Sequence, residues 1–162
     1  MATSGFGPTQ AVGDPSKPEL VFGLIGALGA NIANTETSLR GRLVQLGYSV
    51  AETIKLSELL RDLKGPRFEA LRVEPGRAHV SLYMDAGNEL RSVTGRGEAV
   101  ALLGVNGLRS IRRSIGFPAG KTANAHAFIL NSLKHPAEVG ALREIYGPAF
   151  VAVPFSTSAP SE

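Results

Sequence analysis

The sequence predicts an α/β fold of three layers, in which helices cover both faces of a parallel sheet. Four strand candidates, at residues 20–25, 48–56, 125–130 and 150–155, alternate along the chain with segments that have helical spacing. Alternation of this kind is typical of right-handed β–α–β units, whose strands are parallel. A chain of 162 residues, of which 43% are hydrophobic, is long enough to form one such domain with a buried core.

The first strand is expected at residues 20–25, because a continuous apolar run indicates a strand that is buried on both faces. A glycine-rich turn should follow at residues 26–31. Asn34 is expected to cap the next helix, with an acidic residue in its first turn, and Gly47 should end it. The inward face of this helix should carry leucines with helical spacing, namely Leu39, Leu43 and Leu46.

The second strand is expected at residues 48–56, with Val50 and Ile54 facing the same way. Ser57 should cap a short helix after it. Residues 64–77 contain two glycines and two prolines, which predicts a long loop. Residues 78–91 should be helical in part.

A longer helix is expected at residues 98–115, with a break near Asn106, because two glycines in its middle cost about 1 kcal/mol each. After the strand at 125–130, Pro136 should open a helix at its first position, and Gly147 should stop it before the last strand. The inner face of that helix should carry Val139, Leu142, Ile145 and Tyr146.

Three segments are expected in the chain: a flexible leader at 1–18, a globular domain at 19–155 and a polar tail at 156–162. The absence of cysteine excludes disulfides, thiolate metal sites and cysteine nucleophiles. The net charge of +3 permits an anionic partner, but it is too small to predict nucleic acid. No apolar run reaches the roughly 20 residues of a membrane span, and no secretory signal is evident, so we expect a cytoplasmic protein without a membrane partner.

The glycine-rich turn is the first candidate site. A strand, a glycine loop and a helix N-terminus together direct backbone N–H groups at one point that suits phosphate. The phosphate-binding pattern is G-x-x-x-x-G-K-[ST], and from Gly26 onward Asn31, Ile32 and Ala33 stand where that pattern has glycine, lysine and the hydroxyl residue. We therefore expect phosphate binding without phosphoryl transfer and without a tightly held Mg²⁺, and a tight turn with no ligand remains the alternative. The phosphate-binding residues predicted here are Gly26, Gly29, Ala30 and Asn31.

Two later segments carry further candidates for the same cleft. Asp85, Asn88 and Arg91 lie close together beside a glycine, where they are able to bind a sugar, a base edge or a phosphate, unless they only mark a helix end. Lys134 follows a buried strand, as ligand-binding residues of open α/β sheets do, and its alternative is a solvated lysine. Arg109, Arg112 and Arg113 share one helical face, which we expect to be solvated, with a phosphate or a nucleic-acid backbone as the alternative partner. The histidines are expected to be structural, namely His79, His126 and His135.

Three segments together resemble one protein family. They are residues 19–29, residues 84–91 (Met-Asp-Ala-Gly-Asn-Glu-Leu-Arg) and residues 129–139 with 142–147. Over about residues 19–155, the chain resembles the N-terminal P-loop, nucleoside-kinase-like domain of the bacterial anti-phage deoxycytidylate (dCMP/dCTP) deaminases. The resemblance implies a nucleotide as ligand and a zinc deaminase domain as partner.

The chain departs from that family in one essential respect. Zinc deaminases need H-x-E and P-C-x-x-C, and this chain contains neither motif, so it is not expected to deaminate by itself. Three hypotheses follow. The first is a non-catalytic domain that binds a nucleotide and has a sensing or regulatory role. The second is a divergent nucleoside or nucleotide kinase, in which Lys121 or Lys134 replaces the missing lysine of the loop. The third is an interaction module that docks on a separate deaminase polypeptide.

Overall fold

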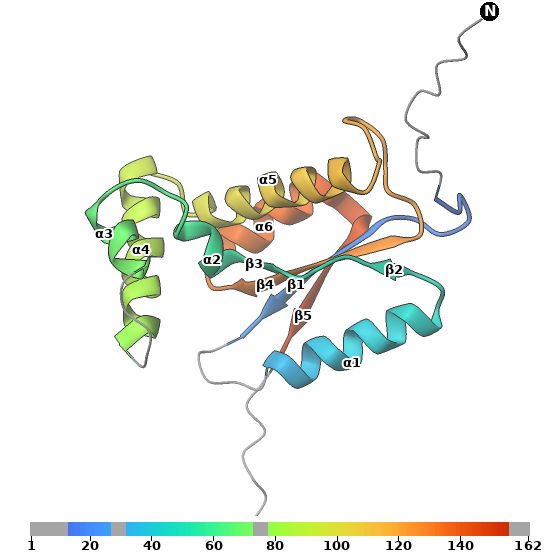
Figure 1. The fold of residues 1–162 in the computed structure, drawn as a ribbon, viewed down its shortest axis with the longest axis horizontal. Helices are drawn as coiled ribbons and strands as arrows, with labels where there is room; N and C mark the ends of the chain where they lie inside the picture. Colours follow the sequence, from blue (N-terminus) through green and yellow to red (C-terminus); the bar gives the residue numbers. More distant parts are fainter. Residues whose placement is uncertain (1–12, 27–31, 73–77, 156–162) are drawn as a thin grey trace, which may run out of the picture.

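The sheet of this protein has five parallel strands. The computed structural model describes residues 13–26, 32–72 and 78–155. The strands run in the order β2-β4-β1-β5, and β3 also pairs with β4 (Figure 1). The strands are β1 (Leu20–Ile25), β2 (Ser49–Val50), β3 (Ile54–Lys55), β4 (His126–Leu133) and β5 (Phe150–Pro154).

Helices cover both faces of this sheet, which confirms the predicted α/β architecture. Helix α1 (Ile32–Gln45) lies on one face, and α5 (Ala99–Ser114) and α6 (Pro136–Tyr146) lie on the other (Figure 1). Helices α2 (Leu56–Leu60), α3 (Pro66–Glu69) and α4 (Ala78–Thr94) lie toward the end of the sheet at which β1 and β4 stop (Figure 1). Two 3-10 turns, η1 (Ala70–Arg72) and η2 (Gly147–Ala149), complete the elements.

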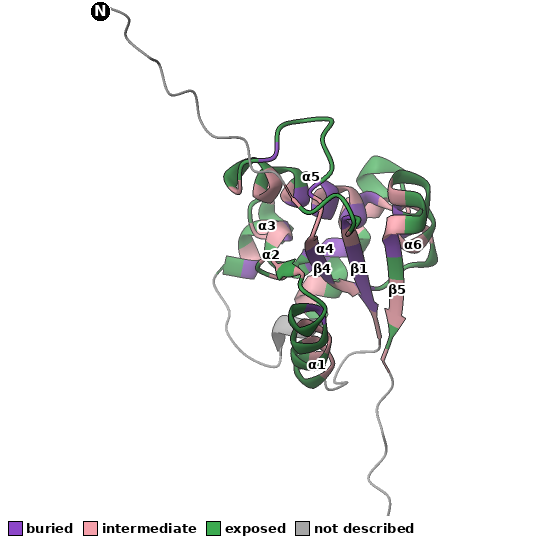
Figure 2. Cartoon of the chain, turned by 90° about the vertical axis from the view of Figure 1, so that its right-hand side faces the viewer, coloured by how far each residue is buried: buried purple, intermediate pink, exposed green. Residues whose placement is uncertain are grey.

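The central strands bury both of their faces, as their apolar sequences predict. In β1, Val21 packs into the core under α5 and α6, whereas Phe22 and Leu24 pack into the core under α1. Gly23 lies so close to its neighbours that a Cβ atom there would come within 2.6 Å of Leu133 Cδ1. Figure 2 shows β1 almost entirely buried and β5, at the edge of the sheet, more exposed.

The expected strand at 48–56 is two short strands instead. Val50 packs into the core under α1 and Ile54 into the opposite core, so the prediction that they face the same way is wrong. The cause is a break between β2 and β3, whose backbone is held by Arg40 of α1. The Arg40 guanidinium donates to the Ala51 carbonyl at 2.9 Å and to Thr53 Oγ1 at 2.8 Å.

Two predicted helix caps are also wrong. Helix α1 begins at Ile32, and α2 begins at Leu56, so Asn34 and Ser57 lie inside their helices. Helix α1 ends before Leu46, which is therefore 67% exposed in the following turn. Gly47 ends the helix as predicted, with a φ of 81° that favours glycine.

The later helices are more regular than the sequence predicts. Helix α5 is continuous, and its Gly104 lets Leu56 approach, since a Cβ atom there would lie 2.6 Å from Leu56 Cδ2. Helix α3 and η1 occupy part of the expected loop at 64–77, and residues 73–77 lie outside the described residues. Helix α6 has Pro136 at its start, as predicted, but Ile145 is 45% exposed and not on the inner face.

The two ends of the chain are described only in part. Residues 13–18 of the expected leader are described, and the Lys17 carbonyl accepts a hydrogen bond from Ala125 N at 2.8 Å. Residues 1–12 and the expected tail at 156–162 lie outside the described residues. Among the described helices, none has the length and apolar character needed to cross a membrane.

Candidate functional site

The candidate site lies where the chain path through the sheet reverses. Strands β1 and β4 are neighbours, but β1 is followed by α1 on one face and β4 by α6 on the other (Figure 1). The connections from β1 to α1 and from β4 to α6 therefore lead to opposite faces of the sheet. A crevice lies between them at the carboxyl ends of these strands. Ligands of open α/β sheets bind in such crevices.

A cavity of about 890 Å³ occupies this crevice. Its base is formed by the ends of β1 and β4 and the residues that follow, namely Ile25, Gly26, Asn131, Ser132, Leu133, Lys134 and His135. An apolar wall from α2, α4 and α5 faces this base, formed by Leu56, Leu60, Tyr83, Met84 and Val100. A cavity of this volume with both apolar and polar lining is typical of sites for small organic ligands.

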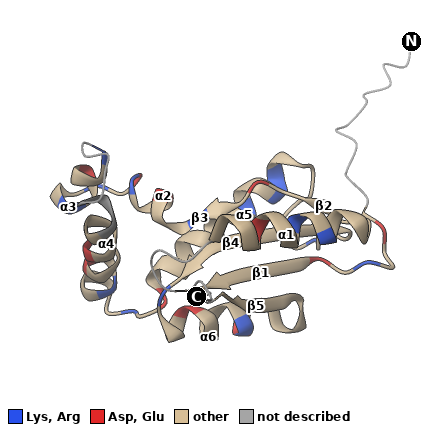
Figure 3. Cartoon of the chain, turned by 90° about the horizontal axis from the view of Figure 1, so that it is seen from below, with Lys and Arg blue, Asp and Glu red and all other residues tan. Residues whose placement is uncertain are grey.

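The charged side chains that line the cavity are all cationic. Lys55, Arg91 and Lys134 contribute to its surface, and no carboxylate does so in the part of the chain that the structure describes. In Figure 3, β1 and β5 carry no charged residues, whereas α4 carries both signs. The cavity therefore favours an anion over a cation.

Lys134 links the two strand ends at the base of the cavity. Its Nζ donates to the Gly26 carbonyl at 3.1 Å, and this atom belongs to the first residue of the glycine-rich turn. Partial burial lowers the pKa of Lys134, and the nearby Glu138 carboxylate opposes that change. A ligand phosphate would supply a counter-charge that Lys134 otherwise has only from Glu138.

Arg91 enters the cavity from α4 in a fixed position. Its Nη2 donates to Glu138 Oε1 at 2.6 Å, its Nε to the Gly97 carbonyl at 3.2 Å, and its Nη1 to Asn88 Oδ1 at 3.2 Å. Glu138 is fully buried, and its second oxygen accepts from the backbone N–H groups of Lys134 at 2.7 Å and His135 at 3.1 Å. This one carboxylate therefore ties the α4 wall to the turn after β4.

Several neutral polar groups at the cavity have no hydrogen-bond partner in the part of the chain that the structure describes. The side chains of Ser57, Asn131 and Ser132 make no hydrogen bond to any described residue, and neither do the amide N–H groups of Asn88. The Asn131–Ser132 peptide is cis. These groups are available to a ligand that has hydrogen-bond donors and acceptors.

The structure brings together half of the residues that the sequence predicts for this site. Gly26, Asn88, Arg91 and Lys134 line the cavity. Asp85 is exposed on α4 and is not among the lining residues. Gly29, Ala30 and Asn31 lie outside the described residues.

Gly26 also has a packing role. A Cβ atom at this position would overlap the ring of Phe155, and Phe155 N donates to the Ile25 carbonyl at 2.8 Å. The packing of Phe155, which directly follows the neighbouring strand β5, thus requires a glycine at position 26, whether or not the turn binds phosphate.

The sequence interpretation missed several residues of the site. Lys55, Ser57, Tyr83 and Met84 lie on elements that only tertiary packing brings to the cavity. Glu138 had a signal in the sequence, since it stands three residues after the helix cap His135, the spacing of a capping box. That spacing predicts the bonds to the backbone but not the bond to Arg91.

Of the remaining polar candidates, Arg112, His126 and His135 make structural contacts, Arg109 and Arg113 are exposed on α5, and the side chain of His79 lies outside the described part of the chain. Arg112, expected on a solvated face, is half-buried and paired with the buried Glu19, and its guanidinium lies 6.0 Å from the rings of Phe128 and Tyr146. Burial lowers the pKa of Arg112 and raises that of Tyr146. His126 bonds the Asn124 carbonyl, and His135 caps α6 by accepting from Ala137 N. Among the described residues, no group of three or more His, Cys, Asp or Glu side chains is placed to hold a metal.

No protein-family model matches this chain, and no curated protein sequence matches it.

Proposed function

We propose that this chain is a nucleotide-binding domain with a sensing or regulatory role and without phosphoryl-transfer activity. The ligand would occupy the cavity beyond β1 and β4, with its phosphate at Gly26 and Lys134 and its organic part against the apolar wall. The observation that carries this proposal is a cavity at the chain reversal whose charged lining is wholly cationic in the described residues.

The chemistry of the lining supports a nucleotide over a simple anion. Phosphate alone would need only the cations, whereas the wall from Leu60, Tyr83 and Met84 offers apolar and aromatic surface to a flat ring. The side chains of Ser57 and Asn131 and the amide N–H groups of Asn88, which have no partner among the described residues, suit the edges of a base or the hydroxyls of a sugar.

The position after the glycine-rich turn argues against catalysis of phosphoryl transfer. Ile32, which stands where a phosphate-binding loop has its lysine, packs into the core under α1 and also lines the cavity. Ala33 offers no hydroxyl for Mg²⁺. The resemblance to the kinase-like half of anti-phage deaminases agrees with a regulatory domain that works with a separate deaminase polypeptide.

Calorimetric titration with a panel of nucleotides tests this proposal. We expect binding in the micromolar to low millimolar range and, for Lys134→Met, a loss of at least about tenfold, since a hydrogen bond to a charged group contributes roughly 1.5–3 kcal/mol. Lys121→Met is the matched control, because Lys121 is exposed in the loop before β4, at the opposite end of the sheet. Absence of binding at millimolar ligand would remove the proposal.

A divergent kinase is the second candidate, and one contact favours it. Lys134 Nζ lies 3.1 Å from the Gly26 carbonyl, so a lysine from β4 stands beside the turn that lacks its own. Lys121, the other displaced lysine considered, precedes β4 and does not line the cavity. Transfer of labelled phosphate from ATP to a deoxynucleoside or its monophosphate, lost in Lys134→Met and kept in Lys121→Met, would establish this function.

A further inference from the structure

We infer that the cavity selects a nucleoside monophosphate bound without a metal ion, in preference to a magnesium–nucleoside triphosphate. This inference rests on the proposed function and names its ligand class. It follows from which of the cationic side chains at the cavity already have an acidic partner.

Two of the three cations at the cavity already have an acidic partner. Arg91 is paired with the buried Glu138 at 2.6 Å, and Lys55 is paired with Glu58 at 3.4 Å. Lys134 is in no ion pair within the described residues, and its Nζ is bonded only to the Gly26 carbonyl. The described lining therefore presents about one uncompensated positive charge, which is closer to the charge of about –1.5 to –2 on a phosphomonoester near pH 7 than to the higher charge of a triphosphate.

A triphosphate would place its additional charges where they lack partners. Each buried charge without a partner costs free energy of desolvation, so the extra phosphates add a penalty and little attraction. Magnesium normally relieves that penalty, and protein sites hold it through one or two carboxylates. Among the described residues, no carboxylate lines this cavity, and Asn131 brings no charge at the end of β4.

The polar groups are placed for a small, hydroxyl-bearing ligand. Asn131 and Ser132 lie next to Lys134 at the base, whereas Asn88 and Ser57 lie on α4 and α2 beside the apolar wall. A phosphate at Lys134 and a base at the wall formed by Leu60, Tyr83 and Met84 would use both sets of groups.

Calorimetric titration of the full chain with a nucleoside mono-, di- and triphosphate of the same base, each with and without Mg²⁺, tests the inference. We expect the monophosphate to bind at least about tenfold more tightly than the magnesium–triphosphate, and its affinity to change by less than about twofold with Mg²⁺. The triphosphate binding most tightly, or only with Mg²⁺, would overturn the inference and leave the proposed function intact. Absence of binding by all three would instead remove the proposed function.

A charge variant provides the second arm of the test. Glu58→Gln removes the acidic partner of Lys55 on an exposed part of α2, so that the positive charge of Lys55 at the cavity is no longer compensated. We expect this variant to bind the di- and triphosphate about threefold to tenfold more tightly and so to narrow the preference for the monophosphate. An unchanged preference would contradict the charge argument.

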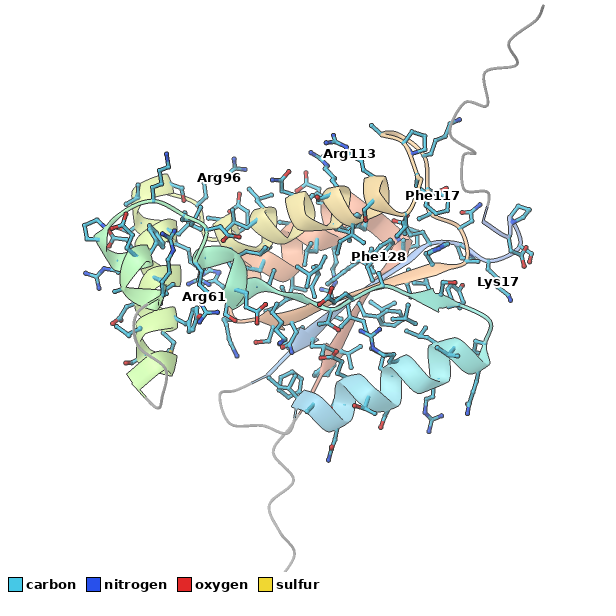
Figure 4. The ribbon with its side chains drawn as sticks, in the orientation of Figure 1. Lys17, Arg61, Arg96, Arg113, Phe117 and Phe128 are labelled. Carbon is cyan, nitrogen blue, oxygen red and sulfur yellow. The ribbon has the colours of Figure 1, made fainter. Side chains whose placement is uncertain are left out.

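Asp14→Asn is the matched control for this arm. Asp14 forms the same kind of exposed pair, with Lys17 at 4.0 Å. Figure 4 shows Lys17 at the end of the molecule opposite to Arg61 of the α2 region. We expect Asp14→Asn to leave the preference for the monophosphate unchanged. A change equal to that of Glu58→Gln would show that the net charge of the protein, and not the charge at the cavity, determines this preference.

Discussion

Two buried glutamate–arginine pairs lie at opposite ends of the sheet. Glu19, just before β1, pairs with Arg112 of α5 and accepts from Ala123 N at 2.6 Å. Glu138, just after β4, pairs with Arg91 of α4 and accepts from two backbone N–H groups. Each carboxylate is almost fully buried, with 4% and 0% of its surface exposed, respectively.

The two pairs differ in what surrounds the arginine. Arg112 lies near the rings of Phe128 and Tyr146, and Figure 4 shows Phe128 inside the layer between the sheet and the helices. Arg91 instead borders a cavity that is lined by two other cations and by several polar groups that have no hydrogen-bond partner among the described residues. Burial of an ion pair therefore does not by itself indicate a ligand site, and the Arg91 end is the candidate because polar groups around it have no hydrogen-bond partner among the described residues.

The largest effect is expected from removal of either glutamate. Glu138→Ala and Glu19→Ala each leave a largely buried guanidinium without its counter-charge and at least one backbone N–H without its acceptor, so each should lower the free energy of unfolding by about 3–5 kcal/mol. Urea denaturation followed by circular dichroism measures both. A loss below about 1 kcal/mol at one end would show that this pair is not structural.

Replacement of each arginine by lysine should lower the free energy of unfolding by different amounts in the two pairs. Arg91 donates to acceptors on Glu138, Gly97 and Asn88, whereas the buried Nε of Arg112 has no hydrogen-bond partner in the described residues. Arg91→Lys should therefore cost about 2–3 kcal/mol and Arg112→Lys about 1 kcal/mol in the same denaturation experiment. Equal losses would mean that the additional bonds of Arg91 contribute nothing.

The pH dependence of ligand affinity should show whether the protonated side chain of Lys134 binds the ligand. Burial holds the pKa of Lys134 below the ordinary lysine value of 10.5. Because the protonated form binds phosphate, affinity should be full at neutral pH and fall as the pH rises through this lowered pKa, which titrations between neutral pH and pH 10.5 measure. Lys134→Met should abolish the dependence, and its persistence in that variant would assign it to another group.

The same lowered pKa affects stability with the opposite sign. The folded chain holds its proton less tightly than the unfolded chain, so the contribution of Lys134 to stability rises with pH between the lowered pKa and 10.5. Denaturation of the ligand-free protein over this range should show the rise in the native chain and a smaller one in Lys134→Met.

The smallest effect is expected at the cap of α6. His135 accepts a hydrogen bond from Ala137 N at 3.1 Å, so His135→Ala should lower stability by about 1 kcal/mol and His135→Asn should restore most of it. Differential scanning calorimetry would measure the shift. A loss for His135→Ala as large as that for Glu138→Ala would show that the cap, and not the buried pair, holds this turn.

The helices and strands were predictable where residues close in the sequence are enough to define them. The run at 20–25 is short, apolar and followed by a glycine-rich turn, which predicts a buried strand, and Gly47 and Pro136 mark helix limits through their own backbone preferences. The break between β2 and β3 was not predictable, because it depends on Arg40 reaching across from α1. The same holds for Gly104, whose cost in an isolated helix is offset by the close approach of Leu56.

The candidate site was predictable only in part for the same reason. Lys134 follows a buried strand, and the geometry of parallel sheets places such residues at the ligand-binding edge. Glu138 and the wall residue Tyr83 act through contacts between elements that lie far apart in the sequence. Asp85 shares a helix with Asn88 and Arg91, but it lies exposed beside the stripe of lining residues, which follows the helical spacing of Met84, Gly87, Asn88 and Arg91.

Backbone amide shifts in a ¹⁵N spectrum, followed during titration with a nucleoside monophosphate, test the central claim most directly. We predict saturable shifts at Gly26, Asn88, Lys134 and His135, and none at Ala123 or Ala125 beside the Glu19–Arg112 pair. Lys134→Met should need at least about tenfold more ligand to reach the same shifts, and Lys121→Met should leave the titration unchanged. Saturable shifts at the Glu19 end, or none at the ends of β1 and β4, would contradict the account.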